Sequence, residues 1–298
     1  MTAAGRAVAS AGYAPANGLQ VYYEIHGAGE PLVLLHGAMG TIQSCFGGLL
    51  PALARSRQVI ALELQGHGHT ADTDRPLSYE QLADDVVAVV GGRGVDRADF
   101  VGYSMGGAVA IQTAMRHPGI VRRVVYAGGA SYTASGLHPA ALQAITATTP
   151  DDLDGSVWQQ AYLTVAPRPS AWATLVAKVN ALDRSFTGWT VEAVRAIAAP
   201  TLLIIGDADI VRPEHTVEMF RLLGGGAVGD LAAMPASQLA VLPGTSHVGV
   251  LDRVEWLRSM ILEFLGPARR ASDQRRVAAQ SGMEADSEAR PETAGAGR

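Results

Sequence analysis

Short apolar runs, separated by helical patterns, constrain the fold of this chain more than any other feature of its sequence. They are rich in Val, Ile and Leu, and most are apolar at successive positions, which is typical of strands buried on both faces of a sheet. Strands that alternate with helices predict a parallel sheet that helices cover on both faces. The runs lie at residues 31–37, 58–64, 98–104, 122–129, 201–207 and 238–244.

Helical patterns fill most of the intervals between these runs. Ser78 is expected to cap a helix that ends near residue 92, and further helices are expected over 105–119, 213–226 and 248–266. Residues 19–27 alternate in polarity and are typical of an antiparallel hairpin strand at the sheet edge. Together the patterns predict an α/β fold with a mostly parallel central sheet of about eight strands.

One interval, residues 131–194, lacks a convincing buried strand and contains helical and turn-like segments. It is expected to form a small helical cap over the carboxyl edge of the sheet. The core is therefore predicted over 15–130 and 195–266. We expect disorder at the N-terminus (1–14) and in the tail (267–298), which is polar, mixed in charge and free of aromatic residues.

Composition argues against several classes of function. The formal net charge of -5 gives no reason to expect nucleic-acid binding. No apolar run approaches the roughly 18 residues of a membrane span, and the N-terminus lacks the apolar run of a secretion signal, so we expect a cytoplasmic protein. Cys45 is the sole cysteine, so an internal disulfide or a cysteine metal cluster is impossible. No metal or other cofactor is expected, and the oligomeric state stays open.

The stretch DFVGYSMGGAVAIQ (99–112) passes abruptly from a buried strand to a small, helix-prone segment. Ser104 stands between the two halves, with Gly102 and Gly106 two residues away on either side. Larger side chains at the two glycines would collide across so sharp a turn. The turn should hold Ser104 in a strained conformation above the sheet edge, with the Met105 N–H at a helix start. This G-x-S-x-G pattern at a strand-to-helix junction favours a nucleophilic serine.

A serine hydroxyl needs a base, and His247 is the best candidate among eight histidines. It follows the last apolar run, at the sheet edge where Ser104 is expected. Asp207 and Asp209 follow the preceding run at the same edge, and one of them could orient the histidine. Asp209 is favoured because it lies farther out, whereas Asp207 is expected to tie down the turn. Asp252 is a weaker alternative, since it falls inside the expected last helix.

The order serine, acid, histidine along the chain resembles that of the α/β-hydrolase superfamily, in its serine-nucleophile branch. The resemblance extends from about Asn17 to Gly266. LLHGAMG (34–40) is similar to the family's His-Gly loop, which implies that Ala38 supplies an oxyanion N–H beside that of Met105.

A second loop adds to the resemblance. ELQGHGHT (63–70) is similar to the family's Asp-x-x-Gly-His-Gly-x-Ser loop, with Glu63 and Thr70 in place of the usual Asp and Ser. The resemblance implies that His36 and His67 brace these loops, and His69 is expected to be exposed.

The resemblance implies a hydrolase that cleaves a small ester or lactone through an acyl-enzyme on Ser104, with a small molecule as its partner and no cofactor. A serine at the elbow argues against the branches that cleave epoxides or carbon–halogen bonds, which carry Asp there. A cofactor-free perhydrolase and a carbon–carbon bond hydrolase stay open as alternatives on the same triad. A ligand receptor that retains the hydrolase shell is an alternative of another class.

Aromatic residues of the expected cap suggest a compact apolar pocket. Met39, Trp158, Trp172 and Trp189 are the candidates for its wall. Simple packing inside the cap is an equally good interpretation of the three tryptophans.

Overall fold

The computed structural model describes residues 10–231 and 234–266, in which eight strands form one open sheet. The strands are β1 (Ser10–Ala16), β2 (Leu19–His26), β3 (Glu30–Leu35), β4 (Arg57–Leu62), β5 (Ala98–Tyr103), β6 (Val121–Ala127), β7 (Thr201–Ala208) and β8 (Gln238–Ser246). Their order across the sheet is β1-β2-β4-β3-β5-β6-β7-β8, and all neighbours from β4 to β8 are parallel. The predicted α/β fold is therefore confirmed.

Alternate side chains of the central strands enter two separate hydrophobic cores. In β3, Val33 and Leu35 pack into one core, while Leu32 and Leu34 pack into the other. Both faces are thus buried, which explains why the strand is apolar at successive positions. Side chains of α3 (Tyr79–Gly92), α4 (Met105–Arg116) and α9 (Pro213–Leu222) close the first core. Those of α1 (Ile42–Phe46), α2 (Leu50–Leu53) and α10 (Val254–Leu265) close the second.

The helix starts and ends agree with the sequence patterns, with one exception. The Ser78 hydroxyl accepts a hydrogen bond from the Gln81 N–H (3.2 Å) and caps α3 as expected. The helix predicted over 248–266 is divided into a short 3-10 turn, η4 (Val248–Asp252), and α10. Arg253 lies at the break, and its guanidinium donates to Thr245 Oγ1 (3.0 Å) and to the Gly244 carbonyl (2.8 Å).

The N-terminal hairpin corrects the predicted boundary of the fold. Residues 10–14, expected to be disordered, belong to β1, which pairs antiparallel with β2 from Ser10↔Ile25 to Ala16↔Leu19. Asn17 and Gly18 both have positive φ (47° and 87°), as a tight hairpin turn requires. Residues 1–9 and 267–298, where disorder was also predicted, lie outside the described residues.

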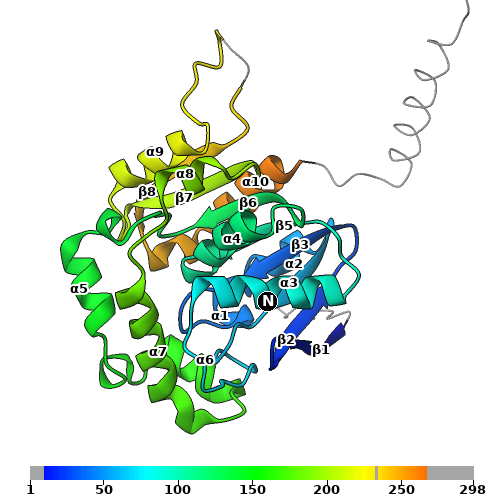
Figure 1. The fold of residues 1–298 in the computed structure, drawn as a ribbon, viewed down its shortest axis with the longest axis vertical. Coiled ribbons are helices and arrows are strands. Elements are labelled where there is room, and N and C mark those ends of the chain that lie inside the picture. Colours follow the sequence, from blue (N-terminus) through cyan, green and yellow to red (C-terminus); the bar gives the residue numbers. More distant parts are fainter. Residues whose placement is uncertain (1–9, 232–233, 267–298) are drawn as a thin grey trace, which may run out of the picture.

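Between β6 and β7 the chain makes an excursion away from the sheet, and this excursion contains four α-helices. These are α5 (Pro139–Ala147), α6 (Val157–Val165) and α7 (Trp172–Ser185), which stand together beside the sheet in Figure 1, followed by the short α8 (Val191–Arg195). The ends of the excursion meet, since Thr133 and Gly188 form an antiparallel bridge and the Trp189 N–H donates to the Tyr132 carbonyl (2.8 Å). The exact division into core and cap at 131 and 194 stays a prediction.

The sheet topology opens a crevice at the carboxyl ends of β3 and β5. The chain moves from β3 to β4 on one side and then returns to place β5 on the other side of β3. Ligands of open α/β sheets bind at such switch points. No helix in the described part of the chain is long and apolar enough to cross a bilayer; the expected cytoplasmic location stays a prediction.

Candidate active site

The turn at Ser104 is sharp and backbone-strained. Ser104 has φ 51° and ψ -120°, and it joins the end of β5 to the start of α4. A Cβ atom at Gly102 would lie 2.2 Å from the Gly106 carbonyl oxygen, which is the collision expected from the sequence. A Cβ atom at Gly106 would instead lie 2.0 Å from the Leu35 carbonyl oxygen of β3. Glycine is therefore required at both positions, the second because of the neighbouring strand.

The structure brings Ser104, His247 and Asp209 together from three separate strand ends. His247 Nε2 lies 3.0 Å from Ser104 Oγ, and His247 Nδ1 lies 2.9 Å from Asp209 Oδ1. A carboxylate only accepts hydrogen bonds, so Nδ1 carries the proton and Nε2 is free to accept one from the serine hydroxyl. The predicted contacts, from the serine to the histidine and from the histidine to the acid, are therefore present in the folded chain.

Asp209 is buried, and its hydrogen bonds keep it ionised. Burial alone would raise the pKa of this carboxyl, but the hydrogen bond and charge of His247 and the N–H groups of Gly129 (3.2 Å) and Val211 (3.4 Å) outweigh burial. The pKa of Asp209 therefore lies below its ordinary value. An ionised acid in this position can stabilise a positive charge on His247.

Asp207 has the separate role expected of it. Its carboxylate accepts hydrogen bonds from the N–H groups of Gly244 (3.0 Å) and Thr245 (3.1 Å), and these bonds lower its pKa. It thus joins the end of β7 to the turn in β8. Asp252 lies in η4, and the Nδ1 position of His247 is already taken by Asp209.

Two residues beside His247 were not singled out from the sequence. The Tyr103 hydroxyl donates to the His247 carbonyl (3.2 Å), and the two rings lie 5.4 Å apart. Gly129 has φ 71°, and a Cβ atom there would lie 2.9 Å from His247 Cε1. The pair Gly128–Gly129 directly after β6 was the available signal for close approach to a catalytic ring.

Ala38 and Met105, whose backbone N–H groups are the expected oxyanion donors, line the same cavity as Ser104. Neither donates a hydrogen bond to another described residue, and Met105 is the first residue of α4. The loop that carries Ala38 is held by His36, whose Nε2 accepts from the Leu64 N–H (3.0 Å) and whose Nδ1 donates to the Gly37 carbonyl (2.8 Å). Burial lowers the pKa of His36 to about 3, so the ring is neutral when it makes these bonds.

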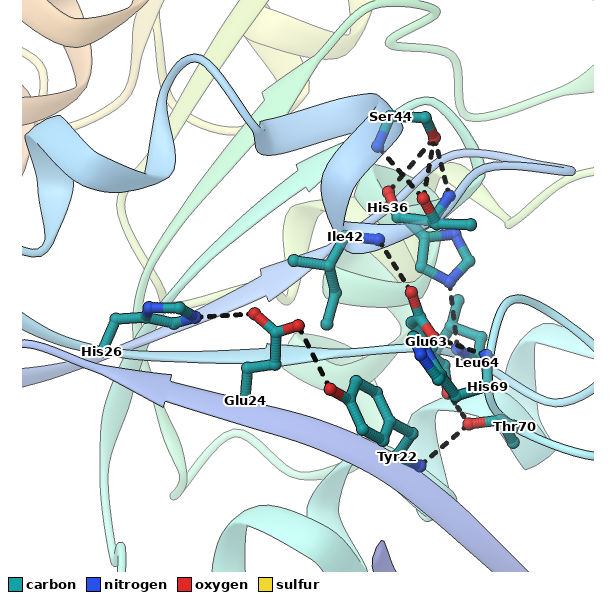
Figure 2. Close-up of polar contacts among 11 residues, drawn as sticks. Tyr22, Glu24, His26, His36, Ile42, Ser44, Glu63, Leu64, His69 and Thr70 are labelled. Atoms are coloured by element: carbon teal, nitrogen blue, oxygen red, sulfur yellow. Dashed lines mark hydrogen bonds and ion pairs between the residues drawn. The ribbon is translucent and has the colours of Figure 1, made fainter. Parts of the chain in front are cut away.

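Glu63 is the centre of a polar network that supports this loop (Figure 2). One carboxylate oxygen accepts from the Ile42 N–H (3.1 Å), and the other accepts from the backbone N–H (2.6 Å) and Nδ1 (2.7 Å) of His69. Thr70 Oγ1 donates to the Glu63 carbonyl (2.6 Å) and accepts from the Tyr22 N–H (2.9 Å). Both residues that depart from the family pattern therefore join the end of β4 to α1 and β2.

His69 is half-buried, whereas it was expected to be exposed. Its side chain is 32% exposed, its ring stacks on Tyr22 with a centroid distance of 4.1 Å, and the Glu63 carboxylate raises its pKa. No local sequence pattern indicated this stacking partner, because Tyr22 lies on β2, far away along the chain.

A mostly apolar cavity of about 360 Å³ lies between the core and the cap and includes Ser104 and His247. Met39 and Trp158 line it, as predicted. Trp172 and Trp189 do not: Trp172 is buried against Tyr162, and Trp189 Nε1 donates to Gln112 Oε1 (2.6 Å). Their assignment to the pocket was therefore wrong, because both rings have partners inside the cap and at its base.

The described residues contain no group of three His, Cys, Asp or Glu side chains placed to hold a metal ion. Besides the tyrosine, serine and threonine hydroxyls of its wall, the cavity is lined by the Ser104 hydroxyl, the His247 imidazole, Ala38 and Met105 with their free N–H groups, and one carboxyl residue, Asp183. This set can move a proton and stabilise an oxyanion next to a nucleophilic oxygen.

Comparisons with known proteins identify the family of the chain. The model of the alpha/beta hydrolase family matches residues 32–259. Pyrrolizixenacetamide deacetylase from Xenorhabdus hominickii is 39% identical, but over only 37% of this chain and 41% of that protein. Pimeloyl-[acyl-carrier protein] methyl ester esterase from Neisseria meningitidis is 28% identical over 79% of this chain and 93% of the relative.

A similar solved structure is that of a meta-cleavage product hydrolase, CumD, from Pseudomonas fluorescens IP01. It has a TM-score of 0.65 and 20% sequence identity, and the likeness covers 87% of this chain and 97% of that one. At this identity the likeness supports the fold alone.

Proposed function

The chain belongs to the alpha/beta hydrolase family, and on that premise we propose that it is a serine hydrolase that cleaves a small ester or lactone. The observation that carries the proposal is the pair of contacts that His247 makes, 3.0 Å to Ser104 Oγ and 2.9 Å to Asp209 Oδ1. They support an activated serine rather than a solvated one.

The reaction would proceed through an acyl-enzyme. Ser104 Oγ attacks the substrate carbonyl while its proton passes to His247 Nε2, and the oxyanion accepts hydrogen bonds from the N–H groups of Ala38 and Met105. The imidazolium, stabilised by Asp209, then gives its proton to the leaving alkoxide. Water, deprotonated by the same imidazole, attacks the acyl group and releases the acid.

A carbon–carbon bond hydrolase is the second candidate, since the solved structure of a meta-cleavage product hydrolase shares the fold. The cavity wall argues for the ester or lactone, because it contains Asp183 and, among the described residues, neither Lys nor Arg. A wall of this charge is poorly suited to a carboxylic acid, which is the substrate in the printed name of one relative, 2-hydroxy-6-oxo-6-(2'-aminophenyl)hexa-2,4-dienoic acid hydrolase. A cofactor-free perhydrolase would use the same three residues, and only its product distinguishes it.

A panel of esters and lactones of increasing acyl size tests the proposal, with p-nitrophenyl acetate as the first substrate. We expect wild-type turnover, and we expect Ser104→Ala to lose it by a factor of about 10³ or more while remaining folded. Ser135→Ala, at an exposed serine of the cap, is the matched control and should behave as wild type.

Ligand binding without turnover in the wild type would overturn the enzyme in favour of a receptor. Turnover that survives in Ser104→Ala would overturn the assignment of the nucleophile.

A further inference from the structure

Asp183 contributes a carboxyl group to the wall of the cavity that contains Ser104 and His247. It lies near the end of α7, the longest helix of the excursion between β6 and β7. Val179, on the same helix, and Phe186, directly after it, also line the cavity, as do Tyr79 and Tyr126 from the core. The carboxyl group is therefore presented to the substrate space from the cap, among largely apolar side chains.

The carboxyl group has no hydrogen-bond or ion-pair partner among the described residues. The adjacent Arg184 directs its guanidinium elsewhere and donates to the Thr146 carbonyl (2.7 Å). Lys178, on the same helix, does have a charged partner, since its Nζ lies 2.7 Å from Asp72 Oδ2. The cap thus satisfies its single lysine fully and leaves the acid that faces the cavity without a partner.

An unpaired carboxyl in such a place is costly. Burial raises the pKa of Asp183 to about 6, against the opposing effect of the nearby Arg184 charge. Its side chain is half-buried, so the carboxyl has lost part of its hydration without gaining a partner among the described residues. A ligand that enters the cavity can supply that partner.

We propose that Asp183 is a specificity-determining residue that binds a primary ammonium group of the substrate, so that the preferred substrates are small esters or lactones carrying a protonated amine. An ammonium group supplies three N–H donors to a carboxylate, and such charge-assisted bonds are about twice as strong as neutral ones. The rings of Tyr79, Tyr126 and Phe186 in the same wall favour a cation further. The statement that the cleaved bond is an ester or lactone rests on the proposed function, whereas the binding of the amine to Asp183 does not.

The pH dependence of binding follows from the groups that face Asp183. They are Tyr79 from α3, Tyr126 from β6 and Arg184 on its own helix. Burial raises the pKa of both tyrosines, so neither titrates between about pH 5 and 8. An ammonium ion should therefore bind more tightly as the pH rises from about 5 to 7.5, while Asp183 loses its proton.

Calorimetry tests binding separately from catalysis. In a Ser104→Ala background, n-butylammonium should bind about tenfold more tightly than n-butanol near pH 7.5, which is ~1.4 kcal/mol. Asp183→Asn should abolish the difference, and Asp183→Glu should retain part of it. Asp154→Asn, the same substitution at an exposed residue of the cap outside the cavity, is the matched control and should keep the full preference.

Equal binding of the two ligands, or a preference that persists in Asp183→Asn, would overturn the proposal. An n-butylammonium affinity that does not rise between about pH 5 and pH 7.5 would also overturn it, because the ion would then not depend on the ionised carboxylate of Asp183. Thermal melts of all variants establish that a lost preference does not come from unfolding.

Kinetics then test the amine on a substrate. Methyl 6-aminohexanoate and methyl heptanoate differ by the replacement of the ammonium group with a methyl group, and the wild type should favour the first by about tenfold in kcat/KM. The ratio should fall to one or below in Asp183→Asn. If the wild type hydrolyses neither ester while n-butylammonium still binds through Asp183, the proposed function fails and the assignment of Asp183 stands.

Discussion

The two walls of the cavity differ in how their polar groups are satisfied. On the core wall, Ser104, His247 and Asp209 are bonded to one another, and further N–H groups hold Asp209 in place. On the cap wall, Asp183 has no partner among the described residues. A polar group with fixed partners is already oriented for one reaction, whereas a group without partners is available to a ligand. On the proposed function, the core wall would carry out the chemical step and the cap wall would select the substrate.

The largest expected effect tests the core wall through two neighbouring acids. Asp209→Asn should lower kcat by about 10³–10⁴-fold, because an amide can leave His247 in the wrong tautomer and does not stabilise its positive charge. Asp207→Asn should change kcat by less than about threefold, since Asp207 contacts only the β8 turn. Steady-state kinetics on one ester measure both variants. Equal losses in the two would contradict the assignment of the acid.

Two tryptophans of the cap test whether packing and substrate contact are separate there. Trp172→Ala should cost about 3–5 kcal/mol in the free energy of unfolding, because its buried ring packs against Tyr162. Trp158→Ala should instead change KM for the longer esters, with a smaller loss of stability, because its half-buried ring faces the cavity. Denaturant unfolding and a substrate panel measure the two effects. A stability loss that is larger for Trp158 would reverse this interpretation.

Acid should lower the free energy of unfolding through two buried histidines, His36 and His67. Burial lowers the pKa of His36 to about 3 and that of His67 to about 4, both below the ordinary value near 6.5. The unfolded chain therefore binds more protons, and the stability present above about pH 6.5 falls by up to ~1.4 kcal/mol per pH unit for each ring as the pH falls. Asp183 acts in the opposite sense, since its raised pKa favours the folded state as its carboxyl becomes protonated.

Unfolding free energies of the wild type and of His36→Asn, measured from about pH 7 down to pH 5, test the effect of the buried His36 ring. His36→Asn should be less stable at neutral pH, and its stability should fall less steeply with acid. An unchanged slope would contradict the buried, neutral ring.

The smallest expected effect concerns Tyr103. Tyr103→Phe removes the hydroxyl that donates to the His247 carbonyl but keeps the ring beside the imidazole. We expect kcat to fall by less than about tenfold with KM unchanged, because Tyr103 positions His247 and does not contact the reacting atoms. Tyr13→Phe, at an exposed tyrosine of β1, is the control. A change in KM alone would mean that Tyr103 contacts the substrate instead.

The sequence predicted the core better than the cap, for a physical reason. Strands buried on both faces must be apolar at successive positions, and the glycines around Ser104 are required by backbone atoms within 2.2 Å of the missing Cβ positions. Such constraints are local and can be read from a few residues. β1 was not predicted, because its sequence, SAGYAPA, is small and weakly apolar. The Asn17–Gly18 turn was the available signal that a partner strand precedes residues 19–27.

No comparable local constraint on the sequence operates in the cap. Trp158 lies in α6, Trp172 begins α7 and Trp189 lies just before α8, and only the first lines the cavity. Which way each ring points depends on partners far away along the chain, such as Gln112 for Trp189. Asp183 was not predicted as a site residue, because an acid on an amphipathic helix is ordinarily a surface residue.

The bridge between Thr133 and Gly188 has a consequence for how such a protein can change over time. Gly188 has φ 126°, and a Cβ atom there would lie 2.8 Å from Thr133 Cα, so the two strands of the excursion leave and rejoin the core through adjoining backbone. Insertions or deletions in the helical part of the excursion, residues 139–187, should leave the register of β6 and β7 in place, whereas residues 136–138 are bonded to the loop that carries Asp209. On the proposed function, substrate preference can therefore change through one continuous stretch of the chain while the contacts of Ser104, His247 and Asp209 are kept.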